Sequence, residues 1–270
     1  MPVLLRPDGA VQVGWDPRRA VLVRPPGGLS PTALATVLRT MRVPVGIAQL
    51  RRLAGGHGLG DTAALDELLT ALVAAGVVRD QAGRARARAL SIRVHGCGPL
   101  SDLLVEALRC SGARIGHTSH ANAGPTGPGV DLVVLSDYLV ADPRLVRDLQ
   151  AAGVPHLPVR VRDGAGLVGP LVIPGVTSCL ACGDLHRTDR DAAWPAVAAQ
   201  LRDVIGSADR PTVLATAALA LGQLHRIITA VRGVEGAGAP PATLDTTLEI
   251  DVNSNRIMTR RWSRHPRCEC

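Results

Sequence analysis

The stretch that decides the fold is residues 90–101, LSIRVHGCGPLS. Its first six residues, with Leu90, Ile92 and Val94 among them, predict a strand. Gly96-Cys97-Gly98 then makes a turn, and Pro99 suits the first position of a helix that continues to residue 110. A strand that passes through glycines into a helix opens the doubly wound α/β domains.

The residues that follow keep this alternation of strand and helix. Residues 130–135 are almost wholly apolar, as expected of a strand buried on both faces. Further strands are expected over 156–162 and 167–173, helices over 143–152, 192–205 and 213–231, and a closing hairpin over 243–262. The pattern predicts a Rossmann-like α/β domain over residues 91–270.

Residues 1–90 follow a different pattern. Strands are expected over 3–6, 11–15 and 20–24, and helices over 32–41, 45–53 and 61–75. Ser30-Pro31 and Asp61 are typical helix starts. A final hairpin is expected over residues 77–90. Three strands, three short helices and a wing predict a winged helix-turn-helix domain over residues 1–90.

Composition limits the function only broadly. The 270-residue chain has a net charge of +7, with arginine but no lysine, so anionic partners are permitted and none is selected. The N-terminus lacks the features of a secretion signal. The most apolar segment, residues 212–231, is interrupted by Gln223, His225 and Arg226. We expect a cytoplasmic protein that does not enter the membrane.

Four of the six cysteines predict a zinc site. Cys179 and Cys182 form a CxxC pair, and Cys268 and Cys270 form a second close pair. Zinc prefers four thiolates in a tetrahedron, and two short pairs supply them. A redox CxxC would open a helix, whereas the glycines around this pair favour a zinc knuckle. We expect structural Zn²⁺ without a catalytic role.

The remaining cysteines and the two later tryptophans are expected to be structural. Cys110 falls on a helix face and is predicted to lie in the core. Packing is also the simpler interpretation of Cys97 in the glycine turn. Trp194 and Trp262 are predicted core anchors in a chain nearly devoid of aromatics.

The glycine turn is an incomplete nucleotide-binding motif. Such a turn uses backbone N–H groups at a helix N-terminus to bind phosphate. Here Ser101 takes the place of the third glycine, Pro99 removes a donor, and no carboxylate lies between Glu106 and Asp131 to bind a ribose. We expect a turn that mainly packs helix against strand, with MgATP binding weak or lost.

The chain resembles the ThiF-type superfamily, which adenylates the C-terminus of carrier proteins. The resemblance runs through residues 130–137, Pro143-Arg144, residues 167–173 and the CxxC. It implies a nucleotide site around Gly96 and Gly98, with Asp137 and Arg144 in the positions that organise the magnesium nucleotide. It also implies a homodimer.

A narrower resemblance lies in residues 179–195, CLACGDLHRTDRDAAWP. This segment is similar to the leader-peptide-binding proteins of azole-forming ribosomal peptide pathways. Those proteins join a winged helix to a ThiF-like domain and deliver a precursor peptide to a YcaO-type cyclodehydratase, which consumes the ATP. The resemblance implies a leader peptide and a YcaO-type enzyme as partners.

The winged-helix domain is expected to bind peptide in preference to DNA. Its third helix carries Asp61, Asp66 and Glu67 and no basic residue, so phosphates would repel it. Peptides instead add a strand to a free sheet edge. The strand Val21-Leu22-Val23 is the predicted edge, and Arg19 and Arg24 beside it would attract an acidic leader.

Three functions therefore follow from the sequence, in order of preference. The first is a non-catalytic scaffold that presents a precursor peptide to a cyclodehydratase. The second is an active ThiF-type adenylyltransferase that uses MgATP on a carrier protein or peptide C-terminus. The third is a winged-helix DNA-binding regulator.

Overall fold

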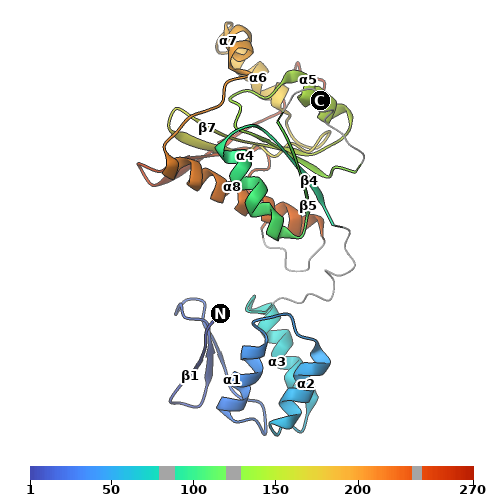
Figure 1. Cartoon of the computed structure of the whole chain (residues 1–270), viewed down its shortest axis with the longest axis vertical. Coiled ribbons are helices and arrows are strands. Elements are labelled where there is room, and N and C mark those ends of the chain that lie inside the picture. Colours follow the sequence, from blue (N-terminus) through green and yellow to red (C-terminus); the bar gives the residue numbers. More distant parts are fainter. Residues whose placement is uncertain (79–88, 120–128, 233–238) are drawn as a thin grey trace. The chain divides into compact units, whose positions relative to one another are not determined.

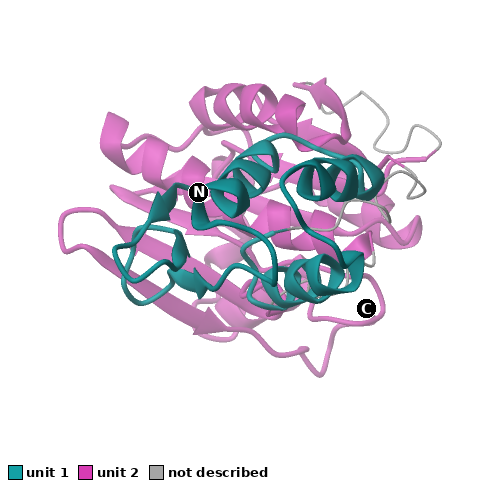
Figure 2. Ribbon diagram, turned by 90° about the horizontal axis from the view of Figure 1, so that it is seen from below, with its two compact units in different colours: residues 1–87 teal, residues 88–270 magenta. Residues whose placement is uncertain are grey.

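A computed structural model describes residues 1–78, 89–119, 129–232 and 239–270. The chain divides into two compact units, Met1–Ala87 and Arg88–Cys270 (Figure 2). Each unit has its own hydrophobic core. The boundary predicted after residue 90 falls close to this division. Each unit is described by itself below.

The first unit has three strands followed by three helices, in the predicted order (Figure 1). They are β1 (Val3–Leu5), β2 (Val11–Val13), β3 (Val21–Val23), α1 (Pro31–Thr40), α2 (Ile47–Gly56) and α3 (Thr62–Ala74). Ser30 and Asp61 cap α1 and α3, because their side chains accept hydrogen bonds from the N–H groups of Ala33 and Ala63. The predicted wing falls mainly on residues 79–88, outside the described residues, so the winged-helix assignment stays a prediction.

The small sheet is antiparallel, with the strand order β1-β2-β3. Its inner face carries Val3, Val11 and Val23, which pack against Leu34 of α1 and Leu65 of α3 in one buried cluster. Because side chains alternate along a strand, Leu22 points to the opposite face, where 56% of its surface is exposed. One face of the small sheet is therefore buried in the core, and the side chain of Leu22 is exposed on the other.

The second unit is built on a seven-stranded sheet with the order β10-β9-β8-β7-β6-β4-β5. Its strands are β4 (Ser91–His95), β5 (Arg114–Thr118), β6 (Leu132–Ser136), β7 (His156–Arg162), β8 (Ala165–Val168), β9 (Thr246–Asp251) and β10 (Arg256–Arg261). Strands β4 to β7 are parallel to one another, and β8 to β10 pair antiparallel. This mixed sheet with helical crossovers confirms the predicted Rossmann-like α/β class.

Helices cover both faces of this sheet. They are α4 (Pro99–Leu108), α5 (Pro143–Ala151), α6 (Leu180–Thr188), α7 (Trp194–Leu201) and α8 (Arg210–Val231). Helices α4 and α8 lie next to each other over one face (Figure 1) and share a core with β4, β6 and β7. Leu145 and Leu149 of α5 pack with Val133 and Leu135 in a separate cluster.

Helix α8 is the one described helix that is long and apolar enough to cross a membrane. Its contacts explain that composition in another way. Ala220, Leu224 and Ile228 are buried in the main core of the second unit, against β7, β8 and α4. The helix therefore packs as a core helix of this domain.

Strand β4 lies at the topological switch point of the parallel strands. The chain leaves β4 for β5 on one side and reaches β6 on the other. In open α/β sheets, ligands bind in the crevice at the carboxyl ends of the strands at such a point. His95 ends β4 and Ser136 ends β6, so these residues mark the crevice.

The structure corrects three local predictions. The CxxC pair does open a helix, because Cys179 is the residue that precedes α6 and Cys182 lies in its first turn. Cys110 is exposed and does not join the core, because α4 ends before it. Helix α7 begins at Trp194, two residues later than predicted, after the Asp191 side chain accepts the N–H of Ala193.

Candidate functional site

The four predicted zinc ligands come together in the second unit. The Sγ atoms of Cys179, Cys182, Cys268 and Cys270 all lie within 4.8 Å of one another. Cys179 is 3.8 Å from Cys182 and 3.5 Å from Cys268, and Cys182 is 3.4 Å from Cys270. Zn–S bonds of about 2.3 Å place the sulfurs of a tetrahedral site roughly 3.8 Å apart, so this set could hold a metal ion.

The acidity of these thiols depends on their surroundings. Burial raises the pKa of Cys179 and of Cys268. Burial acts in the same direction on Cys182, but hydrogen bonds from the backbone of His265 and Cys179 outweigh it and lower the pKa of Cys182. A metal ion that binds here must displace protons, because only thiolates are ligands.

Polar contacts fix the C-terminal segment beside the cysteine cluster. The Asp189 carboxylate, at the end of α6, accepts a hydrogen bond from His265 at 2.7 Å and also binds Arg267. Arg264 donates to the carbonyl of Gly175 at 2.5 Å. The two cysteine pairs are thus brought together by contacts that do not involve the thiols.

Asp137, one of the predicted nucleotide residues, closes the glycine turn. It follows β6 and is 1% exposed, with φ of +70°. Its Oδ1 accepts the N–H of Leu100 at 3.0 Å, and its Oδ2 accepts the N–H of Ser101 at 3.1 Å. These N–H groups belong to the first turn of α4, where a phosphate would bind in a nucleotide site.

The two glycines of the turn make room for this carboxylate. A Cβ atom on Gly98 would lie 2.7 Å from Oδ1 of Asp137, and one on Gly96 would lie 2.8 Å from its Oδ2. Ser101 completes the turn, because its hydroxyl bonds both the N–H and the carbonyl of Gly98. The glycines are therefore accounted for by packing within the protein.

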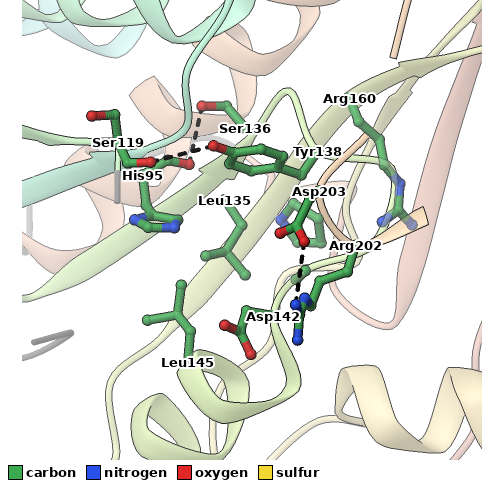
Figure 3. A pocket seen from close by; sticks show the side chains of 12 residues that line it. His95, Ser119, Leu135, Ser136, Tyr138, Asp142, Leu145, Arg160, Arg202 and Asp203 are labelled. Atoms are coloured by element: carbon green, nitrogen blue, oxygen red, sulfur yellow. Dashed lines mark hydrogen bonds and ion pairs between the residues drawn. The ribbon is translucent and has the colours of Figure 1, made fainter. Parts of the chain in front are cut away.

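A cavity of about 210 Å³ lies in the crevice at the carboxyl ends of β4, β6 and β7 (Figure 3). Its lining includes His95, Ser136, Tyr138, Asp142 and Arg160. The volume is below the ~300–1,000 Å³ typical of small-molecule sites. Of the predicted nucleotide residues, the structure brings Gly96, Gly98 and Asp137 together, whereas Arg144 lies in the first turn of α5 and lines neither this cavity nor the turn.

The polar groups of this small cavity are mainly bonded to the protein itself. His95 contacts the hydroxyl of Thr118 at 3.1 Å, and Tyr138 donates to the carbonyl of Ser119 at 3.3 Å. Burial lowers the pKa of His95 and raises the pKa of Tyr138, so both are neutral at pH 7. Residues such as His95 and Tyr138 belong to no sequence motif. Only their position at or just after the end of a predicted strand could have indicated that they line a cavity.

The predicted peptide-binding strand, β3, is an edge of the small sheet. The N–H of Gly14 donates to the carbonyl of Pro2, and the N–H of Arg6 donates to the carbonyl of Ala10. Hydrogen-bonded pairs alternate along an antiparallel ladder, so Gln12, midway between these two pairs, also directs its N–H and C=O to β1. By alternation, the neighbours of Gln12 bond to Val21 and Val23, and the N–H and C=O of Leu22 point away from the sheet. Among the described residues, none pairs with this outer edge.

The opposite edge of the small sheet is less accessible. Arg39 of α1 donates to the carbonyl of Val3 at 3.0 Å, and α1 packs along β1. The flanking arginines, Arg19 and Arg24, are exposed beside β3 as predicted from the pattern. Within residues 1–78, the described part of the first unit, one sheet edge is therefore free, and it carries an apolar side chain with two cations beside it.

Comparisons with known proteins establish a shared fold. No family profile and no curated protein matches the chain. Among solved structures, it is similar to a heterocyclase in complex with substrate and cofactor, with a TM-score of 0.66 and 15% identity, and to the heterocyclase TruD, with 0.62 and 16%. It is also similar to E. coli MccB with ATP, with a TM-score of 0.54 and 12% identity.

The extent of these matches differs. Each covers 99% of this chain, but the chain spans 38% of the first heterocyclase chain and 41% of TruD, against 96% of MccB. The structural neighbours are thus heterocyclases and MccB, and the likeness to them is one of fold. The chain corresponds to about two fifths of the heterocyclase chains.

Proposed function

We propose that this protein is a non-catalytic scaffold that binds the leader of a ribosomal precursor peptide and presents it to a YcaO-type cyclodehydratase. The first unit would bind the leader along β3, and the second unit would bind the enzyme. A homodimer formed through the second unit remains part of this proposal, on the analogy with ThiF-like proteins.

The position of Asp137 is the observation that supports a scaffold without adenylating activity. Its buried carboxylate takes the two N–H groups of α4 that a nucleotide phosphate would need. A phosphate placed there would meet a negative charge at hydrogen-bond distance. The neighbouring cavity of about 210 Å³ adds little space for a nucleotide. Adenylation is therefore the less favoured function.

The likeness to the heterocyclases supports the choice of partner. This chain shares its fold with part of two heterocyclase chains. The YcaO-type enzyme is the partner that the resemblance of residues 179–195 implies.

The free edge of β3 supports the peptide-binding role. An added strand would hydrogen-bond to the outward N–H and C=O of Leu22, while the side chain of Leu22 offers apolar contact. DNA binding is less favoured, because α3 presents exposed Glu67 and no cation. Arg51, from α2, is already paired with Asp66 of α3 at 2.6 Å.

The test is binding of fluorescein-labelled peptides from short reading frames that neighbour the gene, measured by anisotropy. Leu22→Pro removes the outward N–H without touching a bond to β2, and proline is tolerated on an edge strand. We expect it to weaken peptide binding by about tenfold or more. Leu22→Val keeps the N–H, an apolar side chain and a good strand former, and serves as the matched control.

Two results would contradict the proposal. One is peptide binding that Leu22→Pro leaves unchanged, which would remove β3 from the binding site. The other is exchange of labelled pyrophosphate into ATP in the presence of a bound peptide, which would make the protein an adenylyltransferase. Salt-sensitive binding of duplex DNA would instead support a regulator.

A further inference from the structure

A second and larger cavity in the second unit has a strong positive character. Its volume is about 750 Å³, and it lies between the β7–β8 region of the sheet and helices α5, α6 and α7. Six arginines and three aspartates line it. The arginines are Arg147, Arg160, Arg162, Arg187, Arg190 and Arg260. The remaining lining residues are mostly apolar, and among the charged ones the cations outnumber the anions by six to three.

Most of these cations lack an acidic partner. Arg187 pairs with Asp184 at 2.8 Å, and Arg162 lies 3.6 Å from Glu249. For the other four arginines, no carboxylate in the part of the chain that the structure describes lies within ion-pair distance. A folded protein rarely gathers unpaired cations around a cavity unless an anion reduces their repulsion.

Arg160 is the most unusual of them. It lies on β7, borders both this cavity and the small cavity of Figure 3, and is half-buried. Its one hydrogen bond among the described residues goes to the neutral carbonyl of Leu139, at 2.9 Å. Burial, with Arg187 and Arg162 nearby, lowers the pKa of Arg160 to about 10. Its charge is thus retained at pH 7 in an unfavourable position.

The wall beside Arg187 is rigid. Its guanidinium lies 5.0 Å from the ring centroids of both Trp194 and Trp262, a double cation–π contact. Asp184 accepts a hydrogen bond from Trp194 as well as from Arg187, and Trp262 donates to Thr247. The two tryptophans, predicted as core anchors, are half-buried and line this cavity instead. A fixed wall of this kind favours a binding site over a surface hollow.

We propose that this cavity binds a multiply charged small organic anion, with its charged groups on Arg160 and the neighbouring arginines. Planar guanidinium groups bind carboxylates and phosphates through paired hydrogen bonds. The size of the cavity suits a metabolite-sized ligand. The site is separate from the glycine turn, from the cysteine ligands other than Cys179 at its margin, and from β3, so it goes beyond the proposed peptide-binding role.

The test is calorimetric titration of the zinc-loaded full chain with two probes, pyrophosphate for the phosphate source and tricarballylate for the carboxylate source. We expect one of them to bind with 1:1 stoichiometry and to weaken as salt rises. Arg160→Met should weaken that binding by about tenfold or more. Arg109→Met, an exposed arginine at the end of α4, is the matched control and should bind like the native protein.

A second variant keeps the proposal testable if Arg160→Met fails to fold. Arg190 and Arg260 are exposed at the cavity margin, and their double change to Met should fold normally while it weakens binding and reduces its salt dependence. No binding of either probe at millimolar concentration, or equal binding by the native and Arg-to-Met proteins, would overturn the proposal. Leu22→Pro should leave anion binding intact, so this test and the peptide test can fail separately.

Discussion

The cysteine cluster and the glycine turn are both motif-bearing regions of the second unit, but they relate to their expected ligands in opposite ways. The four thiols face one another, with all four sulfur atoms within 4.8 Å of one another, at distances that suit a metal ion. At the glycine turn, the side chain of Asp137 takes the helix N-terminus where a phosphate would sit. A motif can thus remain in a sequence because the protein itself fills the space of the ligand.

The largest effect is expected from breaking the cysteine cluster. A structural zinc site contributes on the order of 10 kcal/mol of apparent binding energy, so Cys182→Ser should release the metal and lower Tm by roughly 10 °C or more. Zinc content by mass spectrometry and thermal unfolding measure this. Cys110→Ser changes an exposed cysteine outside the cluster and should leave both unchanged. A full zinc equivalent in Cys182→Ser would show that the cluster is not the metal site.

The next effect concerns the glycine turn. Asp137→Ala leaves the buried N–H groups of Leu100 and Ser101 without an acceptor, at an expected cost of about 2–4 kcal/mol in the free energy of unfolding. Asp137→Asn keeps one carbonyl acceptor and tolerates a positive φ, so it should lose about half as much. Denaturant unfolding measures both.

Asp148→Ala, an exposed change on α5, is the control for these two variants. If Asp137→Ala were as stable as the control, the carboxylate would not be holding the turn. The comparison between the two motifs would then no longer stand.

A smaller effect follows from His95, which ends the strand before the turn. Burial lowers the pKa of His95 below its usual 6.5. The unfolded chain therefore takes up this proton first as the pH falls. The stabilisation is complete above about pH 6.5 and is lost below it, by at most ~1.4 kcal/mol per pH unit. Unfolding at pH 8 and 5.5, with zinc content monitored, should show a smaller difference in His95→Gln than in the native protein.

His57→Gln, in the first unit, changes an exposed histidine and is the matched control. Equal pH profiles for His95→Gln and the native protein would place the acid sensitivity elsewhere. The buried His156, whose pKa is also lowered by burial, would then be the first candidate.

Periodicity and caps were enough to predict much of the fold. The strand over residues 156–162 matches β7, and Ser30 and Asp61 mark the starts of α1 and α3. Such elements depend on local signals, namely apolar repeats and side chains that accept the first free N–H groups. The cysteine cluster could also be predicted from the sequence, because two close pairs of cysteines supply the four thiolates that zinc prefers.

Other features depend on contacts that no local pattern contains. The resemblance gave Asp137 a nucleotide role, whereas its bonds to α4 join residues 36 and 37 positions apart. The arginine-lined cavity collects residues from the sheet and from three helices. Arg160 looked ordinary along the chain, since an unpaired cation is recognised only when its neighbours in space are known. Trp194 was predicted as a core anchor, and its place in the cavity wall depends on the same contacts in space.

The cysteine cluster also sets an order of events during synthesis. Cys179 and Cys268 are 89 positions apart, so at ~5–20 residues per second the second pair is made about 4–18 s after the first. Until then the CxxC thiols at the start of α6 lack their partners, which follow β9 and β10 along the chain. A metal bound by all four thiols would therefore join the C-terminal segment to α6 only after the rest of the domain has been synthesised.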